Sequence, residues 1–210
     1  MDTSKIKAVV FDCDGVLFDT ALANRKFYDE LLAAFDKPGL TDVQFVNVHM
    51  MTVKAAIDYL FSDEKELSEV YNALQQIGYA KFIPYMKMEK GLVSLLDTLK
   101  LRGFIRAVAT NRTNTMEKVL QDHHLTACFE MVVTASDVEK PKPDPEQLFK
   151  IMAAFDLDPR QIIFIGDSEY DQKAARSAGT WFVAFKQPGL AADFYVNAMD
   201  DILDVLQINE

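Results

Sequence analysis

Short apolar segments alternate with amphipathic segments along most of the chain. The apolar segments cover residues 6–11, 104–109, 130–134, 162–165 and 181–184. Each has the length of a strand, so we predict five strands that are buried on both faces. Amphipathic patterns predict helices over residues 92–101, 115–123, 145–155 and 169–178. This alternation predicts an α/β fold: a Rossmann-like, mostly parallel sheet with helices on both faces.

Residues that start or stop helices agree with these ranges. Gly103 and Gly179 follow two of the predicted helices, where glycine commonly ends a helix. Asn114, with Glu117 three residues later, is the expected cap of the helix over 115–123. Asp144 is the expected cap of the helix that begins at residue 145.

The segment between the first strand and the rest of the sheet has a different pattern. It contains no convincing strand, and helical patterns cover residues 22–35, 53–61 and 67–77. Thr41 with Gln44 and Asp63 with Glu66 match the capping box of a helix start. We therefore predict two domains: a core formed by residues 1–18 and 85–210, and an inserted all-helical cap domain formed by residues 19–84.

Composition narrows the class of protein. The formal net charge of −10 argues against nucleic acid as a main partner. No apolar run approaches the roughly 18 residues of a membrane span, and the first residues do not resemble a signal peptide. Cys13 and Cys128 are the only cysteines, which is no disulfide framework. We expect a cytoplasmic protein, monomeric or homodimeric, whose partner is a small molecule and neither a membrane nor nucleic acid.

Two carboxylates follow the first apolar strand. Asp12 and Asp14 flank Cys13 and precede Gly15. Ligands of open parallel sheets bind beyond the carboxyl ends of the strands, so this pair is placed for chemistry. Such carboxylates can hold a hard cation, attack phosphorus, or divide acid and base duties. Cys13 is expected to be a small buried residue that points away from its neighbours.

Three later segments supply complementary groups. Thr110, Asn111 and Arg112 follow the strand over 104–109, where a hydroxyl and backbone N–H groups can hold a phosphate oxygen. The proline-rich loop over 139–145 contains Lys140 and Lys142, and either ammonium could be aimed at a phosphate.

The strand over 162–165 leads to Asp167 and Asp171. Asp167 could complete a magnesium site opened by Asp12, since Mg²⁺ prefers carboxylates, water and substrate phosphate. Asp171 could bind a metal-bound water, or it could simply compensate the dipole of the first helical turn.

In this order, the four segments resemble the motifs of the haloacid dehalogenase-like hydrolase superfamily. The match covers residues 6 to about 180. The helical insert resembles the cap of the branch that holds phosphoglycolate phosphatase and β-phosphoglucomutase.

The resemblance implies a Mg²⁺-dependent phosphatase that acts on a small phosphorylated metabolite. Asp12 would be the nucleophile that becomes an aspartyl-phosphate, and Asp14 the general acid and base. The remaining roles are implied residue by residue. Asp12, the backbone carbonyl of Asp14 and Asp167 would bind Mg²⁺, with Asp171 in support, while Thr110, Asn111 and Lys140 would hold the phosphoryl group.

Two alternatives stay open. A β-phosphoglucomutase-like mutase is the runner-up, although the cap-hinge histidine of such mutases would align with Asn24 here. A non-catalytic binding protein on the same fold is the other. Lys54 could be imagined as the Schiff-base lysine of phosphonoacetaldehyde hydrolase, but a solvated or anion-binding lysine is the ordinary case.

The candidates for substrate specificity are Asn24, His49, Lys54, Tyr85 and Arg112. Met50 and Met51 are expected in the core.

Overall fold

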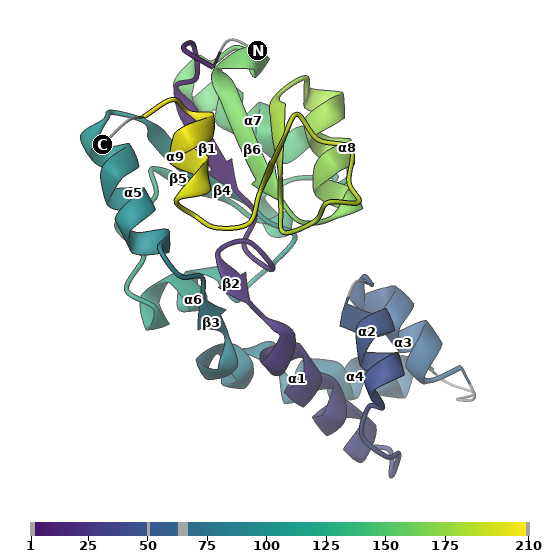
Figure 1. Ribbon diagram of the computed structural model, residues 1–210. Helices are drawn as coiled ribbons and strands as arrows, with labels where there is room; N and C mark the ends of the chain where they lie inside the picture. The colour runs from purple at the N-terminus through teal and green to yellow at the C-terminus, as the bar shows by residue number, and fades with distance from the viewer. Residues whose placement is uncertain (1–2, 50, 63–66, 209–210) are drawn as a thin grey trace. The chain divides into compact units, whose positions relative to one another are not determined.

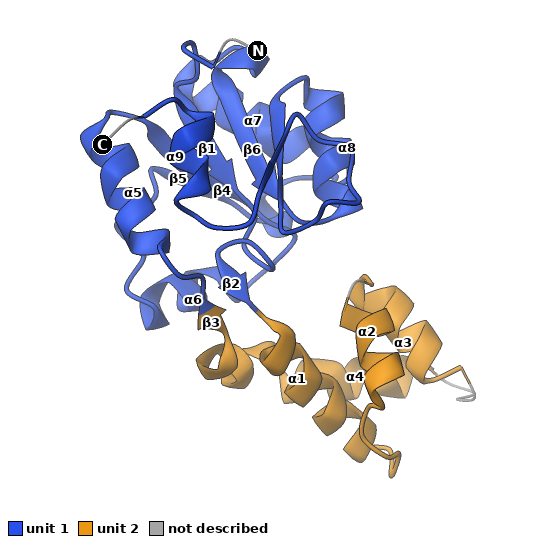
Figure 2. Ribbon diagram, viewed as in Figure 1, with its two compact units in different colours: residues 1–19, 88–210 blue, residues 20–87 orange. Residues whose placement is uncertain are grey.

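The computed structural model of the protein describes residues 3–49, 51–62 and 67–208. The chain divides into two compact units (Figure 2), one formed by residues 1–19 and 88–210 and the other by residues 20–87. The sequence pattern predicted bounds that differ from these by one to three residues. No helix among the described residues is long and apolar enough to cross a membrane.

A six-stranded parallel sheet forms the centre of the first unit (Figure 1). Its strands are β1 (Ala8–Phe11), β4 (Ile105–Ala109), β5 (Met131–Val133), β6 (Ile162–Gly166), β7 (Trp181–Phe185) and β8 (Phe194–Val196). The spatial order is β5-β4-β1-β6-β7-β8. The α/β class and five of the strands agree with the prediction. β8 was not predicted, because a three-residue edge strand carries no recognisable apolar run.

The strand order reverses on either side of β1, the first strand of the chain. β1 pairs with β4 on one side, where Phe11 is opposite Val108, and with β6 on the other, where Phe11 is opposite Ile165. The carboxyl ends of β1, β4 and β6 therefore meet at one edge. In open α/β sheets this is where ligands bind.

Helices complete the first unit. They are α5 (Leu92–Leu101), α6 (Met116–Asp122), α7 (Glu146–Phe155), α8 (Glu169–Ala178) and α9 (Asp201–Val205), with short 3₁₀ helices η2 (Ala135–Asp137) and η3 (Pro159–Gln161). Ala8, Val10 and Phe164 pack in one buried cluster with residues of α7 and α8, such as Leu148 and Ala174. Val9 and Phe11 alternate with these residues and face the other side of the sheet.

The helix ends of the first unit agree only in part with the caps predicted from the sequence. Ser168 caps α8 by accepting a hydrogen bond from the Asp171 N–H, and the Asp171 carboxylate accepts one from the Ser168 N–H. Gly179 ends this helix with φ +76°, a conformation that glycine adopts without strain. The predicted cap at Asn114 was wrong: Thr115 occupies the cap position of α6 and makes no side-chain capping bond. Pro145 takes the cap position that was predicted for Asp144.

The described residues of the second unit form helices and their connections, apart from Lys87, which belongs to β3. The unit contains α1 (Ala21–Ala33), α2 (Asp42–His49), α3 (Val53–Leu60), α4 (Leu67–Ile77) and the 3₁₀ helix η1 (Tyr79–Tyr85). The predicted capping box of Thr41 and Gln44 is present, with each residue accepting a hydrogen bond from the other's backbone N–H. The predicted box of Asp63 and Glu66 lies outside the described residues, as does Met50. Met51 is exposed, so its predicted place in the core was wrong.

Two short strands carry the chain between the units. β2 (Phe18–Asp19) pairs with β3 (Lys87–Met88) in a separate two-stranded sheet. The Glu89 N–H donates to the Leu17 carbonyl at 3.0 Å, which joins the two connections just inside the first unit.

Candidate active site

The end of β1 places Asp12 among buried charges. Its backbone N–H donates to the Ile165 carbonyl of β6 at 2.9 Å, and the residue is 8% exposed. Burial raises the pKa of the Asp12 carboxyl to about 7, with Lys142 opposing that rise. Burial disfavours the ionised form of Asp12, so a nearby cation, such as a bound metal ion, would stabilise that form.

Lys142 is the cation that contacts Asp12. Its Nζ lies 2.7 Å from Asp12 Oδ1, 2.7 Å from Asp171 Oδ1 and 2.9 Å from the Ala109 carbonyl oxygen. The side chain is 2% exposed. Burial opposes its charge, but the two carboxylates hold the pKa of Lys142 above its ordinary value. The lysine therefore remains charged inside the protein because both partners are anionic.

Lys140, which was expected to hold the phosphoryl group, lies elsewhere. It is exposed, and its backbone N–H donates to Glu146 Oε2 at 2.9 Å. The expected placement is therefore corrected: Lys142 is the lysine beside Asp12. The loop contains the pattern Lys-Pro-x-Pro twice, beginning at Lys140 and again at Lys142. That repeat was the available signal for Lys142, but only the path of the loop decides between the two.

Three carboxylates gather where β1 and β6 end. Asp12, Asp167 and Asp171 each offer an oxygen within 4.8 Å of the others. Burial, followed by repulsion from Asp12 and Asp171, raises the pKa of Asp167 to about 8. The crowding of the three carboxylates, together with the raised pKa values of Asp12 and Asp167, fits a divalent cation that supplies positive charge. The oxygen-only donor set suits Mg²⁺.

Glycine is required twice beside this cluster. Gly15 has φ +75°, and a Cβ on it would lie 1.9 Å from Asp167 Oδ2. A Cβ on Gly166 would lie 2.3 Å from the Cβ of Asp171. Both acidic side chains therefore pack against bare backbone, which lets them approach Asp12 closely.

Thr110 and Asn111 lie at the end of β4, as predicted. The Thr110 hydroxyl is fully buried and accepts a hydrogen bond from the Arg112 N–H at 3.2 Å. Gln147, which is also fully buried, donates to the Thr110 carbonyl at 2.8 Å. The Asn111 side chain donates to the Lys142 carbonyl at 2.9 Å, which ties this turn to the proline-rich loop.

Asp14 is held by Arg112. Arg112 Nε lies 2.7 Å from Asp14 Oδ2, and Nη2 lies 2.6 Å from Oδ1. The Asp14 side chain is 38% exposed, whereas that of Arg112 is 8% exposed. Arg112 was predicted only as a candidate for specificity, because a contact between residues 98 positions apart leaves no local pattern.

The candidates for substrate specificity in the helical unit do not all contact one another. Within the second unit, Asn24 Nδ2 lies 3.2 Å from His49 Nδ1, and Tyr79 Oη donates to Asn24 Oδ1 at 2.5 Å. Tyr79 was missed, since nothing in its neighbourhood marks an isolated tyrosine. Lys54 is exposed and pairs with Asp58 at 2.6 Å, and that hydrogen bond raises the pKa of Lys54. Tyr85 is 43% exposed and is stacked under the Lys26 ammonium.

Comparison with known proteins agrees with this geometry. The family model of haloacid dehalogenase-like hydrolases matches residues 9–185. The chain belongs to this family. It is therefore a hydrolase by family, with the parallel α/β core and helical unit described above.

Related proteins cover nearly the whole chain. Pyrophosphatase PpaX of Bacillus cereus is 28% identical over 96% of this chain and 97% of its own. N-acetylmuramic acid 6-phosphate phosphatase of Pseudomonas putida is 26% identical over 84% of this chain and 81% of its own. The crystal structure of a subfamily IA hydrolase of the same superfamily from Geobacter sulfurreducens is 37% identical. It superposes with a TM-score of 0.85 and covers 97% of both chains.

Proposed function

We propose that the protein is a Mg²⁺-dependent phosphatase that hydrolyses a small phosphate monoester through an aspartyl-phosphate on Asp12. The observation that carries the proposal is the contact of Lys142 with Asp12 inside a cluster of three carboxylates. A phosphate dianion that approaches a carboxylate nucleophile is repelled unless cations neutralise both. One related protein is named N-acetylmuramic acid 6-phosphate phosphatase, which supports a phosphate monoester as the substrate, and another is named pyrophosphatase, which supports hydrolysis at phosphorus.

In the first half-reaction, an oxygen of Asp12 forms a bond to phosphorus while the bond from phosphorus to the ester oxygen breaks. Asp14 gives its proton to the departing oxygen, which leaves as an alcohol. Lys142, the Thr110 hydroxyl and the backbone N–H of Asn111 hold the phosphoryl oxygens as charge moves onto them.

In the second half-reaction, water attacks the phosphorus of the aspartyl-phosphate. Asp14 takes the proton of that water, the bond to Asp12 breaks, and inorganic phosphate is released. Asp12, Asp167, the Asp14 carbonyl and, in support, Asp171 would hold Mg²⁺. The ion would supply a Lewis acid that draws charge from the phosphoryl oxygens.

The arrangement around Asn24 favours a hydrolase over a mutase. The Asn24 side chain is hydrogen-bonded to His49 and Tyr79 within its own unit. Unlike the histidine of the mutases, the amide of Asn24 does not change charge near neutral pH. Incubation with β-glucose 1-phosphate and a trace of the 1,6-bisphosphate checks this point. We expect inorganic phosphate, and glucose 6-phosphate that forms faster than phosphate would reassign the protein as a mutase.

The direct test uses p-nitrophenyl phosphate with Mg²⁺. We expect Asp12→Asn to keep the fold but to lower turnover by at least about 10³-fold, since an amide does not attack phosphorus. Beryllium fluoride should be found on Asp12 and not on Asp14. A non-catalytic binding protein would give no turnover in the unmodified chain, and substantial activity in Asp12→Asn would remove Asp12 from the mechanism.

Dependence on the metal is tested separately. EDTA should abolish turnover and added Mg²⁺ should restore it. Ca²⁺ should not, because it takes more ligands in a looser geometry than an in-line transfer accepts. Full turnover in the chelated protein would end the proposal of a Mg²⁺ site.

A further inference from the structure

The ion pair between Arg112 and Asp14 joins a buried cation to a carboxylate that solvent reaches. Two parallel N–H···O bonds of 2.7 and 2.6 Å connect them. This is the planar fork with which arginine binds carboxylates and phosphates. The guanidinium is thus already bound in the geometry that an anionic ligand would require.

The position of Arg112 is fixed independently of Asp14. Its backbone N–H donates to Thr110 Oγ1 at 3.2 Å, and its carbonyl accepts a hydrogen bond from the Ala135 N–H at 2.9 Å. Its Nη1 donates to Thr115 Oγ1 at 3.3 Å. The guanidinium is therefore expected to stay in place when Asp14 changes its partner.

The two cations of the first unit's site serve different carboxylates. Lys142 binds Asp12 and Asp171, at the point where the phosphoryl group would be transferred. Arg112 binds Asp14, which acts on the leaving-group oxygen under the proposed function. Under the proposed function, Arg112 would therefore lie on the leaving-group side of the scissile bond, and Lys142 on the phosphoryl side.

We propose that Arg112 determines specificity by binding a second anionic group of the substrate, a carboxylate or a phosphate carried by the leaving group. The inference rests on the proposed function, since it takes Asp14 as the acid and base. When Asp14 turns an oxygen toward the leaving group, a guanidinium that is 8% exposed loses carboxylate contacts. Losing one partner of a buried ion pair is strongly unfavourable.

An anionic leaving group replaces those contacts, and a neutral leaving group does not. The substrate class is therefore a phosphate monoester whose leaving group carries its charge next to the scissile oxygen. An arginine that only oriented Asp14 would instead affect every substrate alike, which is the alternative that the experiment must separate.

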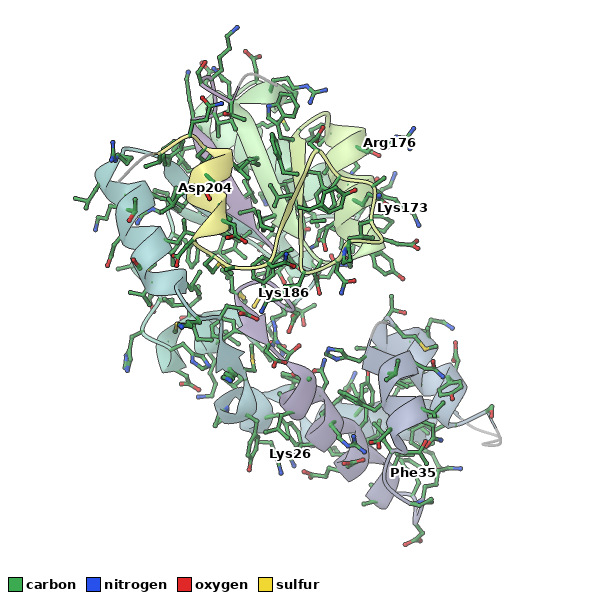
Figure 3. The ribbon with its side chains drawn as sticks, in the orientation of Figure 1. Lys26, Phe35, Lys173, Arg176, Lys186 and Asp204 are labelled. Atoms are coloured by element: carbon green, nitrogen blue, oxygen red, sulfur yellow. The ribbon has the colours of Figure 1, made fainter. Side chains whose placement is uncertain are left out.

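The experiment compares two substrates that differ in one group. 2-Phosphoglycolate carries a carboxylate on its leaving group, and 2-hydroxyethyl phosphate carries a neutral hydroxymethyl group at that place. kcat/KM is measured for both in the unmodified protein, Arg112→Gln and Arg112→Lys. Arg176→Gln is the matched control, because Arg176 is exposed on α8 and projects from its outer face (Figure 3). Circular dichroism and thermal unfolding check that each variant folds.

We expect the unmodified protein to favour 2-phosphoglycolate over 2-hydroxyethyl phosphate. In Arg112→Gln the ratio of the two kcat/KM values should fall by about tenfold or more, as expected for the loss of hydrogen bonds to a charged group. Arg112→Lys, which keeps the charge but not the fork, should give an intermediate ratio, and Arg176→Gln should leave the ratio unchanged.

Two results would overturn the inference alone. One is an equal loss on both substrates in Arg112→Gln, which would make Arg112 an orienting residue. The other is an unchanged ratio together with unchanged rates. An unmodified protein that hydrolyses neither these substrates nor p-nitrophenyl phosphate would instead overturn the proposed function, and the inference with it.

Discussion

Replacement of Lys142 by methionine tests the charge balance of the site. The methionine side chain has similar length and fills the space, but it removes a cation with two carboxylate contacts of 2.7 Å. Removal of one partner from a buried ion pair costs about 3–5 kcal/mol, because the remaining charge is left uncompensated. Here two buried carboxylates, Asp12 and Asp171, lose the same partner.

We therefore expect Lys142→Met to lower the free energy of unfolding of the metal-free protein by about 3–5 kcal/mol at pH 8. Loss of the cation from the phosphoryl side should also reduce kcat by about 10²–10³-fold, the usual effect of deleting one preorganised electrostatic contact. Urea unfolding followed by circular dichroism in EDTA measures the first effect. Turnover of p-nitrophenyl phosphate in Mg²⁺ measures the second.

Lys140→Met is the matched control, because it makes the same substitution two residues earlier in the same loop. The Lys140 side chain is exposed, so the free energy of unfolding should change by less than about 0.5 kcal/mol. Its turnover should stay within about twofold of the unmodified protein, since an exposed charge is screened by water and salt. If Lys140→Met abolished turnover while Lys142→Met remained active and stable, the reasoning from the buried ion pairs would be refuted.

Two further predictions concern the acidic cluster. Gly15→Ala should destabilise the protein by at least about 1–2 kcal/mol and weaken Mg²⁺ binding, because the added Cβ meets Asp167 and φ is +75°; unchanged Mg²⁺ titration would contradict this. Burial raises the pKa of Asp12 to about 7 and of Asp167 to about 8. Between about pH 4 and 8 the folded metal-free protein thus binds more protons than the unfolded chain, so its thermal stability should fall as pH rises. Mg²⁺ should restore more stability at pH 8 than at pH 5, and a rising curve in EDTA would disprove the assignment.

Periodicity and helix signals were sufficient for the core architecture. The strands before Asp12, Thr110 and Asp167 could be predicted because buried parallel strands are short, continuous apolar runs. Parallel strands have their carboxyl ends at the same edge of the sheet, so the proximity of Asp12 and Asp167 could also be predicted from the sequence. The short edge strand β8 was not predictable, because three residues carry no recognisable apolar run, and the cap of α6 was not, because Thr115 makes no side-chain capping bond there.

Only the tertiary structure decided which charged groups are partners. Lys140 and Lys142 have nearly the same local surroundings in sequence, yet one is exposed and the other is buried against Asp12. The path of the loop determines which of the two lysines is buried, since an ammonium group is buried only where carboxylates compensate its charge. The same holds for the pairing of Arg112 with Asp14. The chain by itself thus determines the fold class and the carboxylates at the strand ends, because those follow from local periodicity. The tertiary structure determines which cation contacts each carboxylate, because ion pairing depends on distance and burial and not on spacing along the chain.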